Sequence, residues 1–135
     1  MNRIVEKKGR WVEQHILYDP DNGTRGNCAQ ACIASILGLP IHAVPHFAEN
    51  AASAAEFWDG IEEFVNIHGY DLMMLSPNSR PDGLYLASGM SLRGVYHMVV
   101  MRGGSVFHDP HPSKTGLVDI EHVHLLVPFD PCLTK

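Results

Sequence analysis

Three side chains of the sequence have the types that acyl-transfer chemistry needs: the thiol of Cys28, the imidazole of His97 and the carboxylate of Asp109. A thiolate attacks carbonyl carbons, and an imidazole beside it moves the proton. A carboxylate that accepts a hydrogen bond from one ring nitrogen leaves the other nitrogen free to act on the thiol. The combination predicts a cysteine hydrolase that works through a thioester, with Cys28 as nucleophile, His97 as base and Asp109 orienting the imidazole.

The position of Cys28 relative to a predicted helix favours this role. The preceding segment 19–27 is dense in turn formers, Asn27 is a good N-cap, and Gly38 ends the apolar run, so we expect a helix over 28–37. Unpaired N–H groups and the helix dipole favour negative charge at a helix start. The backbone N–H of Cys28 can also donate to an oxyanion that forms beside the sulfur.

The other two cysteines are given no catalytic role. Cys32 lies one turn after Cys28, and we interpret it as packing, because free cysteine behaves as a small buried hydrophobe. Cys132, near the end of the chain, has no evident function.

His97 stands in an otherwise apolar predicted strand, and the next strand brings Asp109 back toward it. If Gly103 and Gly104 alone form the turn, His108 shares the face of His97. If the loop has three residues and a bulge, Asp109 shares that face instead. We favour the bulged loop, since it joins the carboxylate to the imidazole.

The rest of the pattern predicts the elements that position these residues. A capping box at 53–56 precedes apolar residues at helical spacing, which predicts a second helix over about 53–68. Short β-like runs follow. Helices first and strands afterwards indicate an α+β domain, with helices on one face of an antiparallel sheet. The predicted strands are 71–75, 84–87, 95–102, 105–108 and parts of 117–129.

Three segments together carry a family resemblance: Gly26 to Pro40 around the cysteine, Tyr96 to Val100, and Phe107 to Pro110. They resemble the C39-like branch of the papain-like cysteine peptidases, including small members found in bacteria and their phages. The resemblance covers most of the chain in the order Cys, His, Asp. It implies a papain-like fold, with an N-terminal catalytic helix packed on a sheet, and cleavage of a peptide, isopeptide or related amide bond.

The resemblance also implies a second donor to the oxyanion. In the family this is a polar side chain, usually Gln, six residues before the cysteine, and Asn22 stands at that position here. Asn can donate through its amide, although it is shorter than Gln. Gln14 is the other candidate, if the intervening loop folds back.

Three other functions remain open at this stage. The same triad can run acyl transfer or deamidation, because either an amine or water can resolve the thioester. A catalytically silent papain-like protein can serve as a binding module. The nine histidines also raise a metal site, in the segments 108–111 and 121–124, but neither matches a specific motif such as HExxH. We therefore expect no metal and no cofactor, and we interpret His122 and His124 as facing solvent or a partner.

Length and composition bound the class of protein. A chain of 135 residues that is 45% hydrophobic is the size of one domain, and we expect residues 1–135 to form one. The net charge of −5 argues against nucleic acid as a partner and leaves a peptide or protein substrate. No segment reaches the roughly 18 apolar residues of a membrane span, and no signal sequence is evident. Three cysteines, an odd number, favour a reducing, cytoplasmic location.

Overall fold

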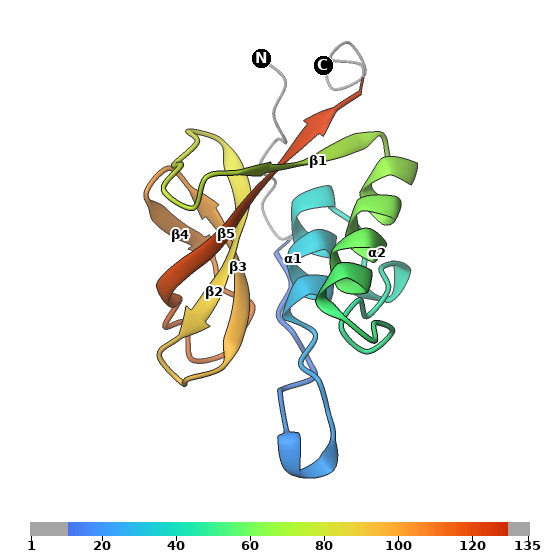
Figure 1. Cartoon of the computed structure of the whole chain (residues 1–135), viewed down its shortest axis with the longest axis vertical. Coiled ribbons are helices and arrows are strands. Elements are labelled where there is room, and N and C mark those ends of the chain that lie inside the picture. Colours follow the sequence, from blue (N-terminus) through green and yellow to red (C-terminus); the bar gives the residue numbers. More distant parts are fainter. Residues whose placement is uncertain (1–10, 130–135) are drawn as a thin grey trace.

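A computed structural model of the chain describes residues 11–129. These residues form two α-helices and a five-stranded sheet in which every neighbouring pair of strands is antiparallel. Both helices lie on the same side of the sheet (Figure 1). The predicted α+β arrangement is therefore confirmed. Within the described part of the chain, neither helix has the length and apolar character that a membrane crossing requires.

Helix α1 spans Cys28–Leu37, the range predicted from the sequence. It ends because Gly38 adopts the left-handed conformation, with φ of 71°, and its N–H reaches back to carbonyls of the last turn. At its start, the side chain of Asn27 does not cap the helix. Its Oδ1 atom instead accepts a hydrogen bond from Ile16 N at 2.9 Å, which ties the preceding segment to the helix start.

Helix α2 spans Ala54–Ile67. Ser53 is its N-cap, and its hydroxyl accepts a hydrogen bond from Glu56 N at 3.2 Å, as the capping box predicts. The short 3-10 helix η2, Ile41–Ala43, lies in the connection between the two α-helices.

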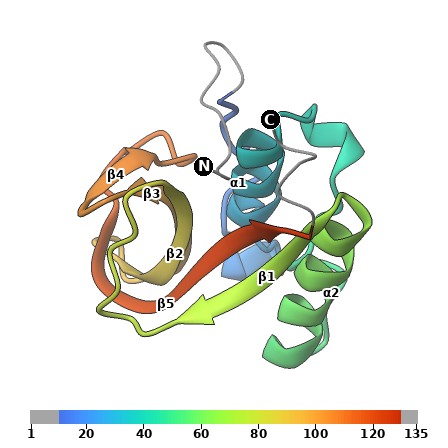
Figure 2. The same ribbon diagram turned by 90° about the horizontal axis from the view of Figure 1, so that it is seen from above.

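The sheet has the strand order β1-β5-β2-β3-β4 and is strongly curved (Figure 2). Its strands agree with the predicted runs except that β2 is four residues longer than 84–87. The bounds are Tyr70–Leu75 for β1, Leu84–Ser91 for β2, Tyr96–Arg102 for β3, Ser105–His108 for β4 and Leu117–Pro128 for β5.

Glycine at position 89 lets two strands approach closely near the site. The pairing of β2 with β5 shifts register between Ser88 and Gly89, which marks a bulge. A Cβ atom at Gly89 would lie only 1.9 Å from the carbonyl oxygen of Asp119. Gly89 also pairs with His97 on the neighbouring strand β3, so this close approach lies beside the predicted base.

Buried apolar side chains form two clusters, one on each face of the curved sheet. The larger cluster fills the space between the helices and the sheet, and it includes Ile33, Ile36 and Ile61. The smaller one lies on the opposite face of the sheet, around Tyr85 and Val99. Because β3 contributes to both clusters, its central residues are buried on both sides and its position relative to α1 is fixed.

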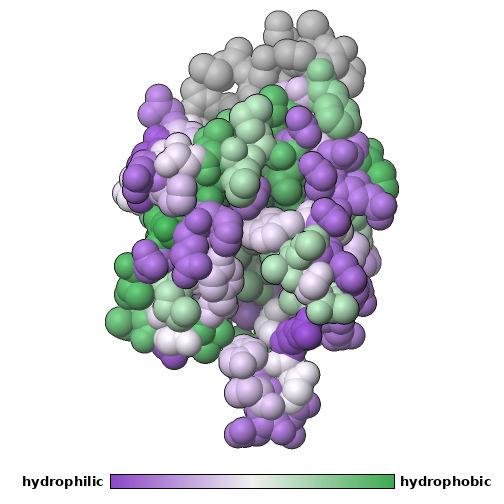
Figure 3. All heavy atoms as spheres, in the orientation of Figure 1, coloured by the Kyte–Doolittle hydropathy of each residue, from purple (hydrophilic) through white to green (hydrophobic). Residues whose placement is uncertain are grey.

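A loop before α1 projects from the rest of the molecule (Figures 1 and 3). It contains the 3-10 helix η1, Pro20–Asn22, and is closed by paired hydrogen bonds between the backbones of Asp19 and Thr24. We call residues 17–25 the projecting loop. Its two ends meet again at the body of the molecule, where Asn27 N donates to Ile16 O at 3.1 Å.

Candidate active site

The two cysteines of α1 occupy different environments. Cys28, the first residue of the helix, is partly exposed, whereas Cys32 is fully buried. Burial, followed by the nearby Cys28 and Asp109, raises the pKa of Cys32 well above its usual range, so it remains a thiol. Its Sγ donates a hydrogen bond to the carbonyl oxygen of Met98 at 3.4 Å. The interpretation of Cys32 as a packing residue is confirmed.

The contact between Cys32 and Met98 also shows how closely helix α1 packs against strand β3. Cys28 lies one turn before Cys32, and His97 lies one residue before Met98. Both Cys28 and His97 line the same cavity. The packing of Cys32 against Met98 therefore places the Cys28 thiol and the His97 imidazole, which are predicted to act together, at the same cavity.

His97 and Asp109 form a buried pair. The Nε2 atom of His97 lies 2.7 Å from Oδ1 of Asp109, and because a carboxylate only accepts, the ring nitrogen donates. The side chains are 3% and 2% exposed, so water does not compete for the bond. With Nε2 engaged, Nδ1 is the ring nitrogen left for the sulfur of Cys28.

The predicted pairing is correct, but the position of the bulge is not. Arg102 pairs with Ser105, so Gly103 and Gly104 alone form the turn, contrary to the expected three-residue loop. The extra residue lies further along β4, since Met101 pairs with Val106 but Val100 pairs with His108. A bulge at either place shifts the register by one residue, and Asp109 therefore still meets His97.

The carboxylate of Asp109 is fully paired. Besides the imidazole, Oδ1 accepts from His111 N at 2.9 Å and Oδ2 accepts from Gly116 N at 2.8 Å. Burial alone would raise the pKa of Asp109, but the hydrogen bonds from His97, His111 and Gly116 outweigh it and hold the pKa well below its usual range. Asp109 is thus a fixed negative charge at neutral pH.

The negative charge of Asp109 affects the pKa of the His97 imidazole. Burial by itself lowers its pKa, but hydrogen bonds with the Asp109 carboxylate and with the Cys28 side chain outweigh burial and raise the pKa to about 9. A histidine with that pKa is protonated at neutral pH. The site is therefore arranged to stabilise an imidazolium between a carboxylate and a sulfur atom.

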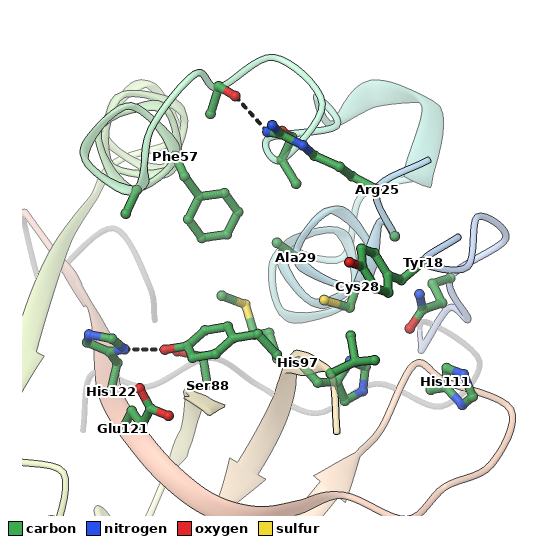
Figure 4. Close-up of a pocket in the computed structure, with 18 of the residues that line it drawn as sticks. Tyr18, Arg25, Cys28, Ala29, Phe57, Ser88, His97, His111, Glu121 and His122 are labelled. Carbon is green, nitrogen blue, oxygen red and sulfur yellow. Dashed lines mark hydrogen bonds between the residues drawn. The ribbon is translucent and has the colours of Figure 1, made fainter. Parts of the chain in front are cut away.

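The cavity beside Cys28 has a volume of about 910 Å³ and runs between α1, the start of α2 and the strands β2, β3 and β5 (Figure 4). Tyr18 and His111 lie at one end, and Phe57, His122 and Glu121 lie toward the other (Figure 4). Three of the large apolar side chains exposed on the molecule, Leu17, Tyr18 and Tyr96, line it. Exposed apolar side chains gathered in one hollow indicate a binding surface.

Asn22, the residue predicted to complete the oxyanion hole, is not at the site. It lies in η1 of the projecting loop, is exposed, and donates through Nδ2 to Asp19 Oδ2 at 2.6 Å. It does not line the cavity. The prediction for Asn22, six residues before Cys28, is wrong because the projecting loop carries that residue away from the start of α1.

Gln14, the other candidate, lines the same cavity as Cys28. It is 8% exposed, and its backbone N–H donates to Pro110 O at 3.0 Å. Its Nε2 donates to Ile16 O at 2.9 Å, which uses one of the two amide hydrogens. Among residues 11–129, no other acceptor engages the second hydrogen, which an oxyanion could use.

The histidines considered for a metal site do not converge. His108 Nε2 is hydrogen bonded to Val12 O at 2.6 Å. His124 does not face solvent as expected: it is 5% exposed and stacks on Trp58 with ring centroids 4.1 Å apart, and burial followed by His122 lowers its pKa to about 4. Over residues 11–129 there is no group of three His, Cys, Asp or Glu side chains placed to hold a metal ion.

Several lining residues were not singled out from the sequence. The sequence indicates Phe57 only as an apolar residue at helical spacing, and it indicates nothing for Ser88. Tyr96 enters only through the family resemblance, and Glu121 only through the possible metal segment 121–124. These residues come from segments that are distant in sequence and meet Cys28 only in the folded protein, so no local motif indicates them. The lining contributed by α2, the residues before it, and strands β2, β3 and β5 includes Ala52, Ala54, Phe57, Trp58, Ser88, Tyr96, Glu121 and His122.

Comparison with known proteins leaves the family open: no protein-family model matches the chain, and no curated protein and no solved structure matches it either.

Proposed function

We propose that this protein is a cysteine hydrolase that cleaves a peptide, isopeptide or related amide bond, and that its fold is papain-like. The observation that carries the proposal is the buried hydrogen bond from His97 to Asp109 in a cavity that also contains Cys28. A solvent-shielded imidazole with a raised pKa, between a carboxylate and a cysteine at a helix start, is costly to assemble for packing alone. The resemblance of the sequence to C39-like peptidases supports the same assignment.

In the proposed reaction, the Cys28 sulfur attacks the carbonyl carbon of the scissile bond and a tetrahedral oxyanion forms. Collapse of this intermediate breaks the C–N bond as the His97 imidazolium gives its proton to the leaving amine, and an acyl thioester remains on Cys28. Neutral His97 then takes a proton from water, whose oxygen attacks the thioester. The acid is released, and the sulfur and the imidazole regain their starting state.

Two donors stabilise the oxyanion in this scheme. The first is the backbone N–H of Cys28, and the second is the side-chain amide of Gln14. Asp109 does not take up the proton. It holds the imidazole in one orientation and stabilises its charged form.

The experiment that tests the proposal is alkylation of each cysteine by iodoacetamide over a range of pH, followed by mass spectrometry. Cys28 should react quickly near neutral pH, and His97→Ala should slow it at least about tenfold. The matched control is His108→Ala on the same hairpin, because His108 binds Val12 O and does not line the cavity. Equal, slow labelling of Cys28 in the parent and in His97→Ala would overturn the proposal.

The same preparation identifies the reaction. Incubation with a mixed peptide library, with and without an added amine, should give new carboxyl termini in the parent and none in Cys28→Ala. Products that carry the added amine in place of a free acid would instead assign acyl transfer, which uses the same thioester.

A further inference from the structure

The cavity continues from Cys28 into a hollow whose walls are apolar and whose far end is acidic. We call this part the acidic-ended chamber and define it by Ala54, Phe57, Trp58, Tyr96, Met98 and Glu121, which all line the cavity. Glu121 lies beside His122, at the end opposite Tyr18 and His111 (Figure 4). A side chain that enters from the sulfur therefore passes aromatic and aliphatic surface before it reaches a carboxylate.

The aromatic walls of the chamber are held in place by their own contacts. The hydroxyl of Tyr96 is hydrogen bonded to His122 Nδ1 at 2.5 Å, and His122 lies with its ring centroid 5.7 Å from that of Trp58. Phe57 and Trp58 meet edge to face at 5.0 Å. These contacts hold the aromatic rings in fixed orientations, so the chamber is formed before any ligand binds.

The carboxylate of Glu121 has no cationic partner among residues 11–129. The cavity wall contains two arginines, and both are engaged elsewhere. Arg25 donates to Ala48 O and Ala51 O, each at 2.7 Å. Arg93 donates to Ser113 Oγ at 2.9 Å, near His111 at the opposite end. The chamber thus ends at an exposed carboxylate that no cationic side chain of residues 11–129 pairs with.

We propose that the acidic-ended chamber binds a long aliphatic side chain that ends in a cation, the lysine or arginine of a peptide substrate. The inference rests on the proposed function and names the substrate class for the same site. The aliphatic stem packs against Phe57 and Trp58, while the charged end reaches Glu121. Aromatic faces near the end of the chamber add cation–π attraction. An acidic side chain in the same place meets Glu121 as a like charge.

The test uses bromoacetamides whose amide nitrogen carries alkyl tails of increasing length, ending in a methyl, ammonium or carboxylate group. Each reagent alkylates Cys28: the sulfur forms the C–S bond as bromide leaves, and the proton that the sulfur has given up stays on the His97 imidazolium or is released to water. The readout is the second-order labelling rate of Cys28. At the tail length that reaches Glu121, the ammonium tail should react about fivefold faster than the methyl tail, and the carboxylate tail slower than both.

Variants at two glutamates separate a local charge effect from the overall negative charge. Glu121→Gln should abolish the advantage of the ammonium tail. Glu63→Gln, an exposed residue of α2 outside the cavity lining, makes the same change in net charge and should keep the advantage. An advantage of equal size in all three proteins, or fastest labelling by the methyl tail, would overturn the inference.

Failure of this inference is distinguishable from failure of the proposed function. The function is judged by the effect of His97→Ala on the iodoacetamide rate, whereas the chamber is judged by the ratio between tails within one protein. If Cys28 reacts too slowly for such ratios, binding is measured directly in Cys28→Ala by NMR titration with N-acetyl-lysine methylamide and N-acetyl-norleucine methylamide. Tighter binding of the lysine compound, lost in Glu121→Gln, supports the inference, and equal binding of the two overturns it.

Discussion

The Sγ atom of Cys32 lies 3.4 Å from the carbonyl oxygen of Met98, and this contact joins helix α1 to the strand that carries His97. Cys32 is fully buried, so the space between α1 and β3 is set by a small side chain. A larger residue must push the two elements apart, because close-packed interiors do not absorb added volume.

This contact predicts different results for two substitutions at position 32. Cys32→Ala should lower the free energy of unfolding by about 1 kcal/mol and leave the labelling rate of Cys28 unchanged. Cys32→Leu should cost about 2 kcal/mol and also slow Cys28 labelling, since His97 is moved away from the sulfur. Urea unfolding and iodoacetamide kinetics on both variants check this. Parent-like Cys28 kinetics in a folded Cys32→Leu protein would contradict it.

The raised pKa of His97 predicts a definite pH dependence of stability. In the folded protein the pKa is about 9, against 6.5 for an ordinary histidine, so the folded state binds the proton more tightly than the unfolded state. The stabilisation by the His97 imidazolium is fully present below pH 6.5 and is lost as the pH rises toward 9. The free energy of unfolding of the parent should therefore exceed that of His97→Gln most at pH 6, and the gap should narrow by pH 9. Urea unfolding at both pH values measures the gap, and a gap that widens with pH would argue against an imidazolium.

The placement of Gln14 predicts which residue assists the oxyanion. A peptide aldehyde forms a tetrahedral adduct with Cys28 and develops an oxyanion, whereas iodoacetamide does not. Gln14→Ala should weaken aldehyde binding about tenfold to a hundredfold while iodoacetamide labelling stays close to the parent rate. Asn22→Ala, on the projecting loop, should change neither, and serves as the control. Loss of aldehyde affinity in Asn22→Ala and not in Gln14→Ala would contradict this prediction and identify Asn22 as the oxyanion donor.

The close approach at Gly89 predicts a large loss of stability on substitution. A methyl group there would overlap the backbone of β5 at Asp119, and backbone cannot move aside cheaply. Gly89→Ala should therefore lower the free energy of unfolding by about 3 kcal/mol or more. Gly104→Ala is the matched control: no atom lies within 4 Å of the added Cβ, and its effect should stay within about 0.5 kcal/mol. Chemical denaturation of the two variants is the measurement.

The features predicted correctly from the sequence are those that depend on neighbouring residues. The helix that begins at Cys28 is bounded by a turn-rich loop and by Gly38, and the cap of α2 is a local hydrogen bond between Ser53 and Glu56. The meeting of His97 with Asp109 followed from a single hairpin. Its bulge was misplaced because two adjacent glycines suit both a two-residue turn and a bulged loop, and pairing further along the strands decides between them.

The features missed are those assembled by contacts between distant segments. Trp58 and Glu121 reach the cavity from α2 and β5, elements that are separated by most of the sheet in sequence. The burial of His124 follows from its stacking on Trp58, which a strand pattern does not reveal. Asn22 was chosen by its distance along the chain, and that distance has no spatial meaning when a loop intervenes.

The projecting loop leaves the body of the protein at Ile16 and returns at Asn27, and two hydrogen bonds join these residues: Asn27 N donates to Ile16 O, and Ile16 N donates to Asn27 Oδ1. These hydrogen bonds close the base of the projecting loop. The number of residues in the loop can therefore change without changing the distance between Gln14 and Cys28. Leu17 and Tyr18, in the projecting loop, line the cavity. A different loop on the same base would change which side chains border the cavity, while Cys28, His97 and Asp109 would stay where they are.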